Sequence, residues 1–489
     1  MQLYDMTLHE LSDMLAKRKI SSKELTLSVL DRIDVTESRL NSFITIDRQG
    51  ALKQAESVDF KRSKGENLSV LAGIPIGLKD NICTKDLRTT CASKMLENYV
   101  PPYSATAAHK LAECDAVIIG KLNMDEFAMG SSTENSFFGV TKNPFDVTKV
   151  AGGSSGGCAA AVSSGEVIAA LGSDTGGSVR QPASFCGAVG LKPTYGTVSR
   201  YGLVAFASSL DQIGPICKCV RDTAIMLSHI VGHDKHDPTS LNRGYPTFSA
   251  DTKSSLDGLR IGLPTELYEK RTAPDVLKRF EEAVEILEKH GACVKHISIE
   301  GIRFALPAYY VISSAEASSN LARFDGVRYG FRADGISGIN ELYTKTRSQG
   351  FGDECKRRIL LGTFVLSEGY RDKYYKKAVT ASRLLVHSVK QQFENVDLIA
   401  TPTCAETAFD IGKKVRDPVQ MYHSDIFTVL ANLTGIPAIS VPCGLDKGGL
   451  PVGIQLMANS FGEQTLFDAA SVIEACVGRI MRRCENDRI

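Results

Sequence analysis

Short apolar runs interrupted by glycine restrict the fold of this chain more than any other feature. They occupy residues 74–78, 116–120 and 167–171, and segments with helical spacing, such as 105–111, lie between them. Short apolar runs without polar alternation are typical of strands that are buried on both faces of a sheet. We therefore predict an α/β fold in which strands and helices alternate.

The same pattern returns near the C-terminus, in residues 397–400, 438–441 and 452–456. Because late segments repeat the style of the early ones, we expect one sheet that distant parts of the chain complete. Between them, residues 260–264 and 293–299 have the character of strands, and a helix is predicted over 275–290. This passage is expected to form a β-α-β unit.

No linker, internal repeat or low-complexity segment divides the chain, so we predict a single domain. Two helices are expected at its start, because Thr7 with Glu10 and Ser21 with Glu24 have the spacing of capping boxes. The expected parts are N-terminal helices within 1–70, a core within 71–220, and the remaining sheet and substrate-pocket segments within 221–489.

Charge and cysteine content argue against several classes of protein. With 57 basic and 56 acidic residues, the net charge of +1 creates no overall field that favours nucleic acid or an anionic membrane. The closest pair among 13 scattered cysteines, Cys217 and Cys219, lacks the spacing of a zinc ribbon. We expect reduced thiols and a soluble cytoplasmic protein, because neither a signal peptide nor a long apolar segment is recognisable.

The run Gly172–Arg180 carries the strongest chemical signal. Within it, Thr175, Gly176, Gly177 and Ser178 combine a hydroxyl nucleophile with glycines, whose backbone can turn several N–H groups toward one point. Such N–H groups can stabilise an oxyanion. A tight turn between a strand and a helix is the alternative for this composition. No histidine is near in sequence, so another group must accept the serine proton.

Ser154 and Lys79 are the candidates for that role. Ser154 lies in a second glycine-rich loop, which a helix of small residues joins to the first. Lys79 follows the apolar run 74–78, so its side chain is expected to start in the core, where burial lowers the pKa of an ammonium. A neutral lysine can then activate a serine. The alternative is a salt bridge from Lys79 to Asp80 or Asp174.

Other motif matches lack the context that their chemistry needs. Residues 152–156 match G-x-S-x-G, but the preceding segment 143–149 is poor strand material for a nucleophile elbow. The single Asp-Thr-Gly at 174–176 has no second copy to complete an aspartic protease dyad. Gly157 is not followed by the Lys-Ser/Thr of a phosphate loop. The histidines and aspartates of 233–237 indicate a solvated loop rather than a metal site.

Several motifs together resemble the signature of the amidase signature family. They are residues 152–157, 172–180, 181–183 and 190–194. The resemblance extends over essentially the whole chain to the glutamine-hydrolysing subunits of tRNA-dependent amidotransferases. That wider match rests on residues 125–131, 198–203, 209–215 and 356–359. The resemblance implies one central mixed β-sheet covered by helices on both faces.

The resemblance also implies a catalytic triad. Ser178 is the implied nucleophile, Ser154 follows a cis peptide bond and passes the proton, and Lys79 is the neutral base. The N–H groups around Thr175, Gly176, Gly177 and Ser178 are implied to hold the oxyanion.

The substrate implied by the resemblance is glutamine. Arg358 is implied to bind its α-carboxylate and Asp425 its α-ammonium, because an arginine fork suits a carboxylate. Tyr309 and Ser131 are implied as further substrate contacts. From the local sequence alone, Arg358 would be a surface charge beside Lys356 and Arg357.

In the tRNA-dependent amidotransferases that the chain resembles, the reaction is shared among the three different subunits of a heterotrimer. No cofactor or metal is implied on this chain. ATP and Mg²⁺ are implied on a partner, the B subunit, which binds tRNA, and a small C subunit joins the two. The implied acceptor is misacylated Glu-tRNA(Gln), with Asp-tRNA(Asn) as an open second acceptor. The alternative is a stand-alone amidase of the same fold.

Overall fold

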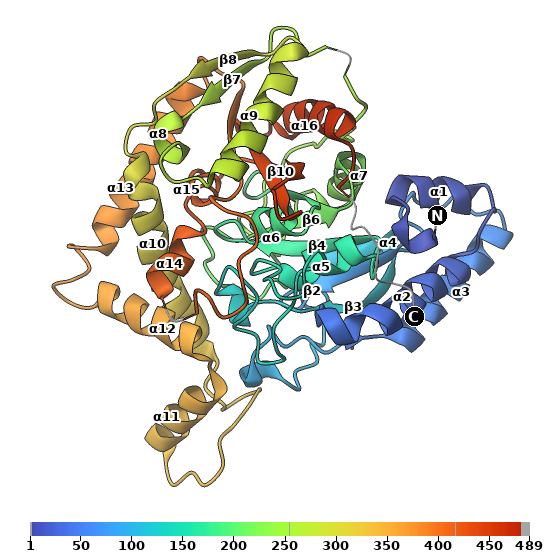
Figure 1. The fold of residues 1–489 in the computed structure, drawn as a ribbon. Coiled ribbons are helices and arrows are strands. Elements are labelled where there is room, and N and C mark those ends of the chain that lie inside the picture. Colours follow the sequence, from blue (N-terminus) through green and yellow to red (C-terminus); the bar gives the residue numbers. More distant parts are fainter. Residues whose placement is uncertain (1, 254, 416, 481–489) are drawn as a thin grey trace.

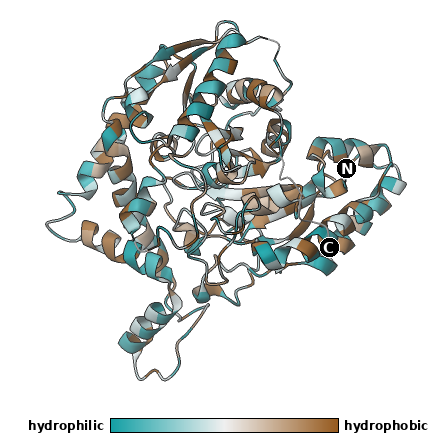
Figure 2. Ribbon diagram, viewed as in Figure 1, coloured by the Kyte–Doolittle hydropathy of each residue, from teal (hydrophilic) through white to brown (hydrophobic). Residues whose placement is uncertain are grey.

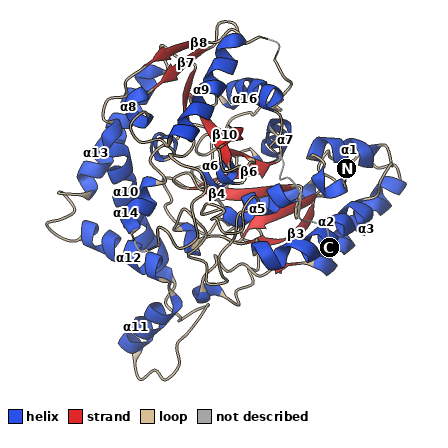
Figure 3. Ribbon diagram, viewed as in Figure 1, coloured by secondary structure: helices blue, strands red, loops and turns tan. Residues whose placement is uncertain are grey.

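One mixed sheet of eleven strands runs through the residues that the computed structural model describes, which are 2–253, 255–415 and 417–480. Helices flank this sheet on both sides (Figure 1, Figure 3). The strand order is β1 (Phe43–Ile46), β3 (Val117–Leu122), β2 (Pro75–Lys79), β4 (Ala169–Asp174), β6 (Gln212–Cys217), β5 (Val189–Lys192), β10 (Ala438–Leu445), β11 (Pro451–Ala458), β9 (Leu398–Pro402), β7 (Arg260–Leu263) and β8 (Cys293–His296). The predicted α/β class with a mixed sheet is confirmed.

The helices are distributed along the whole chain. They are α1 (Leu8–Ala16), α2 (Ser22–Leu40), α3 (Arg48–Ser63), α4 (Thr106–Glu113), α5 (Gly156–Ser164), α6 (Arg180–Phe185), α7 (Val220–Ile230), α8 (Thr265–Tyr268), α9 (Pro274–Lys289), α10 (Ala305–Asn320), α11 (Ile339–Gly350), α12 (Asp353–Leu366), α13 (Tyr375–Gln392), α14 (Pro418–His423), α15 (Val429–Thr434) and α16 (Glu463–Val477).

Both predicted capping boxes form at the N-terminus. The Thr7 side chain accepts the N–H of Glu10, and Ser21 does the same for Glu24, while each glutamate bonds back to the backbone of its capping residue. These pairs satisfy N–H groups that the first helical turn leaves open. The helices α1 and α2 therefore begin where the sequence places them, at the outer edge of the molecule (Figure 1).

The late strands complete the sheet, as the repeated sequence pattern predicts. β10 pairs antiparallel with β5 on one side and with β11 on the other, and β11 pairs with β9. Segments more than 240 residues apart in sequence thus become neighbours, since Ala438 lies opposite Lys192. Most apolar residues of these strands are buried, and Ile439 and Leu456 have no exposed surface.

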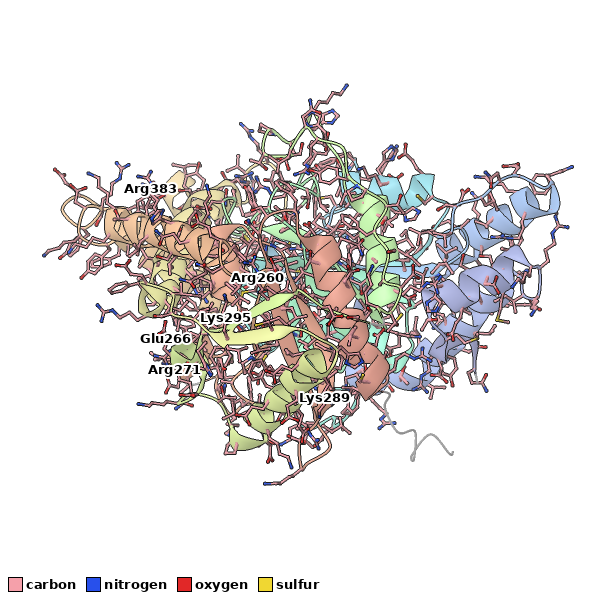
Figure 4. The ribbon with its side chains drawn as sticks, turned by 90° about the horizontal axis from the view of Figure 1, so that it is seen from above. Arg260, Glu266, Arg271, Lys289, Lys295 and Arg383 are labelled. Carbon is pink, nitrogen blue, oxygen red and sulfur yellow. The ribbon has the colours of Figure 1, made fainter. Side chains whose placement is uncertain are left out.

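The β-α-β passage forms with a shorter second strand than expected. β7 and β8 are parallel, and α9 connects them. β8 ends at His296 rather than residue 299, because its partner β7 ends before Pro264, which has no N–H for the ladder. β8 is an edge strand of the sheet, and its exposed Lys295 lies on the face of the molecule that Figure 4 shows from above. A lysine on an edge strand opposes pairing with another chain.

Hydrophobic residues concentrate on the sheet and on the inward sides of the helices, whereas the outlying α11 is largely hydrophilic (Figure 2). The cysteines of the described residues are free thiols, most of them buried. Cys484 lies outside the described residues. Within these residues no helix has both the length and the apolar character required to cross a bilayer.

Two neighbouring parallel strands bring the predicted catalytic segments together. β2 ends at Lys79 and β4 ends at Asp174, directly before the turn that contains Ser178. Because the strands are parallel, their carboxyl ends meet at the same edge of the sheet. In open α/β sheets this edge is where ligands bind.

Candidate active site

Lys79 is buried and directed at a serine. Its side chain has no exposed surface, and its Nζ lies 2.8 Å from Ser154 Oγ. Ser173 holds the same nitrogen through its Oγ at 2.9 Å and its carbonyl oxygen at 3.2 Å. The alternative salt bridge is not formed, because Asp174 pairs with Arg180 and the carboxylate of Asp80 lies beside Lys121.

Burial lowers the pKa of the Lys79 ammonium to about 8. The carboxylates of Asp125, Asp174 and Asp211 oppose this shift, but they do not outweigh the loss of solvent around the nitrogen. About one tenth of Lys79 is therefore the neutral amine at pH 7, far more than for an exposed lysine. A neutral amine at hydrogen-bond distance from a hydroxyl can accept its proton.

Ser154 bonds to Lys79 and lies in the glycine-rich loop that contacts the Ser178 turn. The peptide bond from Gly153 to Ser154 is cis, as the family resemblance implies. The following residue, Ser155, donates its N–H to the carbonyl oxygen of Ser178 at 3.1 Å. The two predicted serine loops are thus in direct contact at the end of the sheet.

The Ser178 hydroxyl is not engaged by any of the described residues. Its side chain is 7% exposed, and no hydrogen bond to its Oγ is formed within the described part of the chain. The structure thus shows the link from Lys79 to Ser154 but not a bond from Ser154 to Ser178. Such catalytic bonds commonly tighten only when substrate is bound.

The turn after β4 has a different arrangement of donors from the one expected. Gly177 donates its N–H to Asp174 Oδ1 at 2.9 Å, so this N–H is not directed at a substrate. The backbone of Gly177 has a φ of 131°, a conformation that glycine adopts without the steric cost of a side chain. The N–H groups of Thr175, Gly176 and Ser178 make no hydrogen bond to other described residues and are left for an oxyanion.

A buried ion pair shapes this turn, and the sequence analysis did not single it out. Arg180 contacts both carboxylate oxygens of Asp174, at 2.9 and 3.0 Å, and also donates to Gln455 and Asn432. Burial opposes ionisation of Asp174, but Arg180 and Asn432 hold the pKa of its carboxyl well below the usual range. The position of both residues within the run 172–180 was a signal that could have identified them.

A cavity of about 390 Å³ lies on the Arg358 side of the site, and none of Lys79, Ser154 or Ser178 lines it. Its lining includes Ser131, Glu126, Arg358 and Tyr422. Three of the four predicted substrate contacts come together next to it. Ser131 Oγ donates to Asp425 at 2.7 Å, and burial raises the pKa of the Asp425 carboxyl to about 6.

Tyr309 and Thr428 connect the catalytic turn with this cavity region. Tyr309 packs directly against Gly176, where an added Cβ would lie 2.4 Å from the tyrosine ring. Thr428 donates to the carbonyl oxygen of Gly176 at 2.5 Å and to that of Asp425 at 3.1 Å. Asp425 therefore has a fixed position relative to the turn that carries Ser178.

Arg358 is buried rather than a surface charge, being 3% exposed. Its Nε donates to Glu354 at 2.7 Å, and the guanidinium lies 4.5 Å from the centre of the Tyr310 ring and 4.7 Å from that of Tyr422. One of its terminal nitrogens, Nη1, is buried without a hydrogen-bond partner among the described residues. An unpaired guanidinium nitrogen at a cavity is suited to a carboxylate ligand.

Tyr310, Glu354 and Tyr422 were not predicted from the sequence. Tyr310 donates to Asp425 at 2.6 Å, and Tyr422 donates to Glu354 at 3.1 Å. Glu354 precedes Arg358 by one helical turn, a spacing that could have suggested an ion pair. The tyrosines carried no comparable sequence signal.

The clusters of potential metal ligands have other roles in the described structure. His9, Cys219 and Asp222 lie close together, but both oxygens of Asp222 accept N–H groups from the start of α1. In the segment 233–237, Asp234 accepts hydrogen bonds from Ser199 and Thr106. These carboxylates stabilise a helix end and a turn.

The sequence of this chain matches the amidase family model over residues 24–467. The chain belongs to the amidase family. It is 52% identical over 485 residues, covering 99% of both chains, to the A subunit of the glutamyl-tRNA(Gln) amidotransferase of Moorella thermoacetica. The crystal structure of the corresponding protein from Thermotoga maritima has a TM-score of 0.81 and 42% identity, covering 98% of this chain and 97% of that one.

The same fold also occurs in amidases with other names. The structure of a peptide amidase from Stenotrophomonas maltophilia has a TM-score of 0.81 at 27% identity, covering 98% of both chains. The higher identity to the amidotransferase subunits therefore carries more information about function than the fold does.

Proposed function

We propose that this protein is the glutamine-hydrolysing A subunit of a glutamyl-tRNA(Gln) amidotransferase. The contact of Ser154 with Lys79, whose pKa is lowered to about 8, near the unbonded hydroxyl of Ser178, is the observation that carries the amidase chemistry. The 52% identity over 99% of both chains supports the particular amide, glutamine.

The first chemical step forms an ester. Ser178 Oγ attacks the carboxamide carbon of glutamine, and its proton passes to Ser154 Oγ while the Ser154 proton passes to Lys79 Nζ. The carboxamide oxygen becomes an oxyanion, which the N–H groups of Thr175, Gly176 and Ser178 stabilise. When the tetrahedral intermediate collapses, the proton returns through Ser154 to the leaving nitrogen, and ammonia departs.

The second step regenerates the enzyme. Water attacks the glutamyl ester on Ser178, again giving its proton through Ser154 to Lys79. Collapse of the second intermediate releases glutamate and returns a proton to Ser178 Oγ. Both steps use the same relay, so the net reaction converts glutamine and water into glutamate and ammonia.

Substrate selection follows from the two charged groups near the cavity. Arg358 Nη1 is available for the α-carboxylate, and Asp425, held by Ser131 and Tyr310, is placed for the α-ammonium. Tyr309 closes the site against the catalytic turn. A simple amide lacks both charges and would make neither ion pair.

The ammonia is consumed by the partner proteins of a heterotrimer in this proposal. Conversion of a glutamyl carboxylate on tRNA into an amide requires activation, for which ATP and Mg²⁺ on the B subunit are the proposed source. The B subunit also binds the tRNA, and the C subunit joins it to this chain. The near-balanced charge of this chain supports that division, because tRNA binding usually requires a basic surface. The proposed location is the cytoplasm.

Amidation of misacylated tRNA tests the proposal. The complex is purified with the B and C subunits and assayed with Glu-tRNA(Gln) and ATP, using either glutamine or ammonium chloride as nitrogen donor; Asp-tRNA(Asn) is the second acceptor. In the Ser178→Ala variant, the glutamine-dependent reaction is expected to disappear while the ammonium-dependent reaction remains. Equal loss of both reactions would contradict the role of Ser178. Hydrolysis of diverse amides without preference for glutamine would instead favour a stand-alone amidase.

A further inference from the structure

Two consecutive buried carboxylates, Asp125 and Glu126, lie next to the site without taking part in the proposed reaction. Asp125 has no exposed surface and Glu126 is 3% exposed. Buried carboxylates are costly unless hydrogen bonds compensate them. Asp125 contacts the relay serine and the loop that contains Ser131, whereas Glu126 contacts the start of the helix that carries Arg358.

Asp125 organises the loop that contains Ser131. Its Oδ2 accepts the N–H of Thr133 at 2.9 Å and that of Ser132 at 3.3 Å, and its Oδ1 accepts the N–H of Asn135 at 3.2 Å. The backbone N–H of Asp125 donates to the carbonyl oxygen of Ser154 at 3.2 Å. One residue therefore contacts both the loop and the relay serine.

Thr133 connects the loop that Asp125 holds with the loop that carries Ser154. Its Oγ1 donates to the carbonyl oxygen of Gly152 at 2.7 Å and accepts the N–H of Gly156 at 3.1 Å. Gly153 packs against the Asp125 carboxylate, where an added Cβ would lie 2.1 Å from Oδ2. The residues on both sides of Ser154 are thus fixed relative to Asp125.

Glu126 holds the start of the helix that carries Arg358. Its Oε2 accepts the N–H of Gly352 at 2.8 Å, and its other oxygen accepts the hydroxyl of Ser93. Gly352 directly precedes α12, in which Arg358 lies in the second turn. The N-terminus of a helix favours a carboxylate through its open N–H groups and its dipole.

We infer that Asp125 and Glu126 are positioning residues that place the Ser154 relay and the Arg358 substrate contact, respectively, from one dipeptide. Neither touches the reacting atoms. The inference rests on the proposed function, because it assigns the two residues to separate steps of glutamine hydrolysis. It predicts that the two carboxylates affect different kinetic constants.

For Glu126, the substitutions to alanine and glutamine form a matched pair. Glu126→Ala removes both acceptors and is expected to raise the KM for glutamine about tenfold, with kcat changed less than about threefold. Glu126→Gln can still accept from Gly352 and donate to Ser93, so its KM is expected to stay within about threefold of wild type. Glu285→Ala, an exposed carboxylate on α9, is the control.

For Asp125, the expected effect is on kcat. Asp125→Asn turns one oxygen into a donor that faces N–H groups, which displaces the relay loop and lowers kcat about 10- to 100-fold, with a smaller change in KM. Thr133→Val removes the two bonds to the Ser154 loop and keeps the shape, whereas Thr133→Ser keeps the hydroxyl. We expect Thr133→Val to lower kcat and Thr133→Ser to restore it.

Labelling of Ser178 by a serine-directed electrophile distinguishes a failure of the proposed function from a failure of the positioning roles of Asp125 and Glu126. If the wild-type protein labels at Ser178 but does not hydrolyse glutamine, the proposed function fails. If it hydrolyses glutamine but Thr133→Val and Asp125→Asn keep the wild-type kcat and labelling rate, the assignment of Asp125 is overturned. A fall in kcat without a rise in KM for Glu126→Ala overturns that of Glu126. Thermal unfolding identifies a variant that does not fold. If Asp125→Asn does not fold, the Thr133 variants test the role of Asp125. If Glu126→Ala does not fold, the KM of Glu126→Gln tests the role of Glu126.

Discussion

A buried lysine whose pKa is lowered to about 8 is the unusual residue of this site. Lys79 has no charged partner within hydrogen-bond distance among the described residues; its contacts are Ser154 and Ser173. Hydroxyl and carbonyl groups stabilise an ammonium less than a carboxylate would, so the desolvation of the nitrogen dominates. In the proposed reaction, Lys79 takes the role of base that histidine more often has in serine hydrolases.

The pH dependence of glutamine hydrolysis tests this property. Burial lowers the pKa of Lys79 to about 8, so below that pH the neutral fraction falls about tenfold per pH unit. We expect kcat/KM to rise from pH 6 to about 8 and then to level off. Initial rates between pH 6 and 9.5, at constant ionic strength, measure this. A flat profile between pH 6 and 8 would contradict the assignment of Lys79 as the base.

At the scale of an element, the turn between β4 and α6 is shaped by its own ion pair. Asp174 accepts the N–H groups of Gly177 and Val179 while it binds Arg180. The carboxylate thereby pulls two N–H groups inward, and others remain free to face a substrate. The buried Asp174–Arg180 pair thus determines which N–H groups of the turn beside Ser178 stay free.

Removal of Asp174 is expected to destabilise the fold. Asp174→Ala leaves the Arg180 guanidinium buried without its counter-charge, which costs about 3–5 kcal/mol in the free energy of unfolding. Urea unfolding followed by circular dichroism measures the change. Asp13→Ala serves as the control, because its ion pair with Lys17 is exposed and contributes at most about 1 kcal/mol. Similar values for the two variants would show that the buried pair is not important for stability.

At the scale of the whole molecule, the sheet depends on both ends of the chain. The segment 71–220, here called the signature core, contains β5 and α6. β5 has β10 as one neighbour, and α6 packs on both β10 and β11. The signature core therefore presents an open strand edge and an uncovered helix unless the C-terminal half is present. Such surfaces lose the burial that stabilises a domain.

Truncation tests this dependence. A fragment of residues 1–259 lacks every strand from β7 to β11 and is expected to show no cooperative thermal transition, although it contains Lys79, Ser154 and Ser178. Circular dichroism during heating, compared with the full chain, measures this. A fragment that unfolds cooperatively near the melting temperature of the full chain would show that the signature core is an independent domain.

Local patterns predicted the individual elements well. The apolar runs became β2, β3 and β4, and the capping boxes set the starts of α1 and α2. These features depend on residues within a few positions of one another, which is the range over which periodicity and capping act. The order of the strands was not predicted, because many pairings bury the same apolar residues.

Sequence motifs and resemblance together named Lys79, Ser154, Ser178, Arg358 and Asp425. The sequence by itself determined which residues can be a nucleophile, a base or a charged substrate contact, because these are properties of side-chain chemistry. Only the tertiary structure decided that Lys79 meets Ser154 across 75 residues, that Gly177 directs its N–H at Asp174, and that Glu126 reaches Gly352. Such contacts join distant segments, and the packing of the whole chain fixes their distances and their burial.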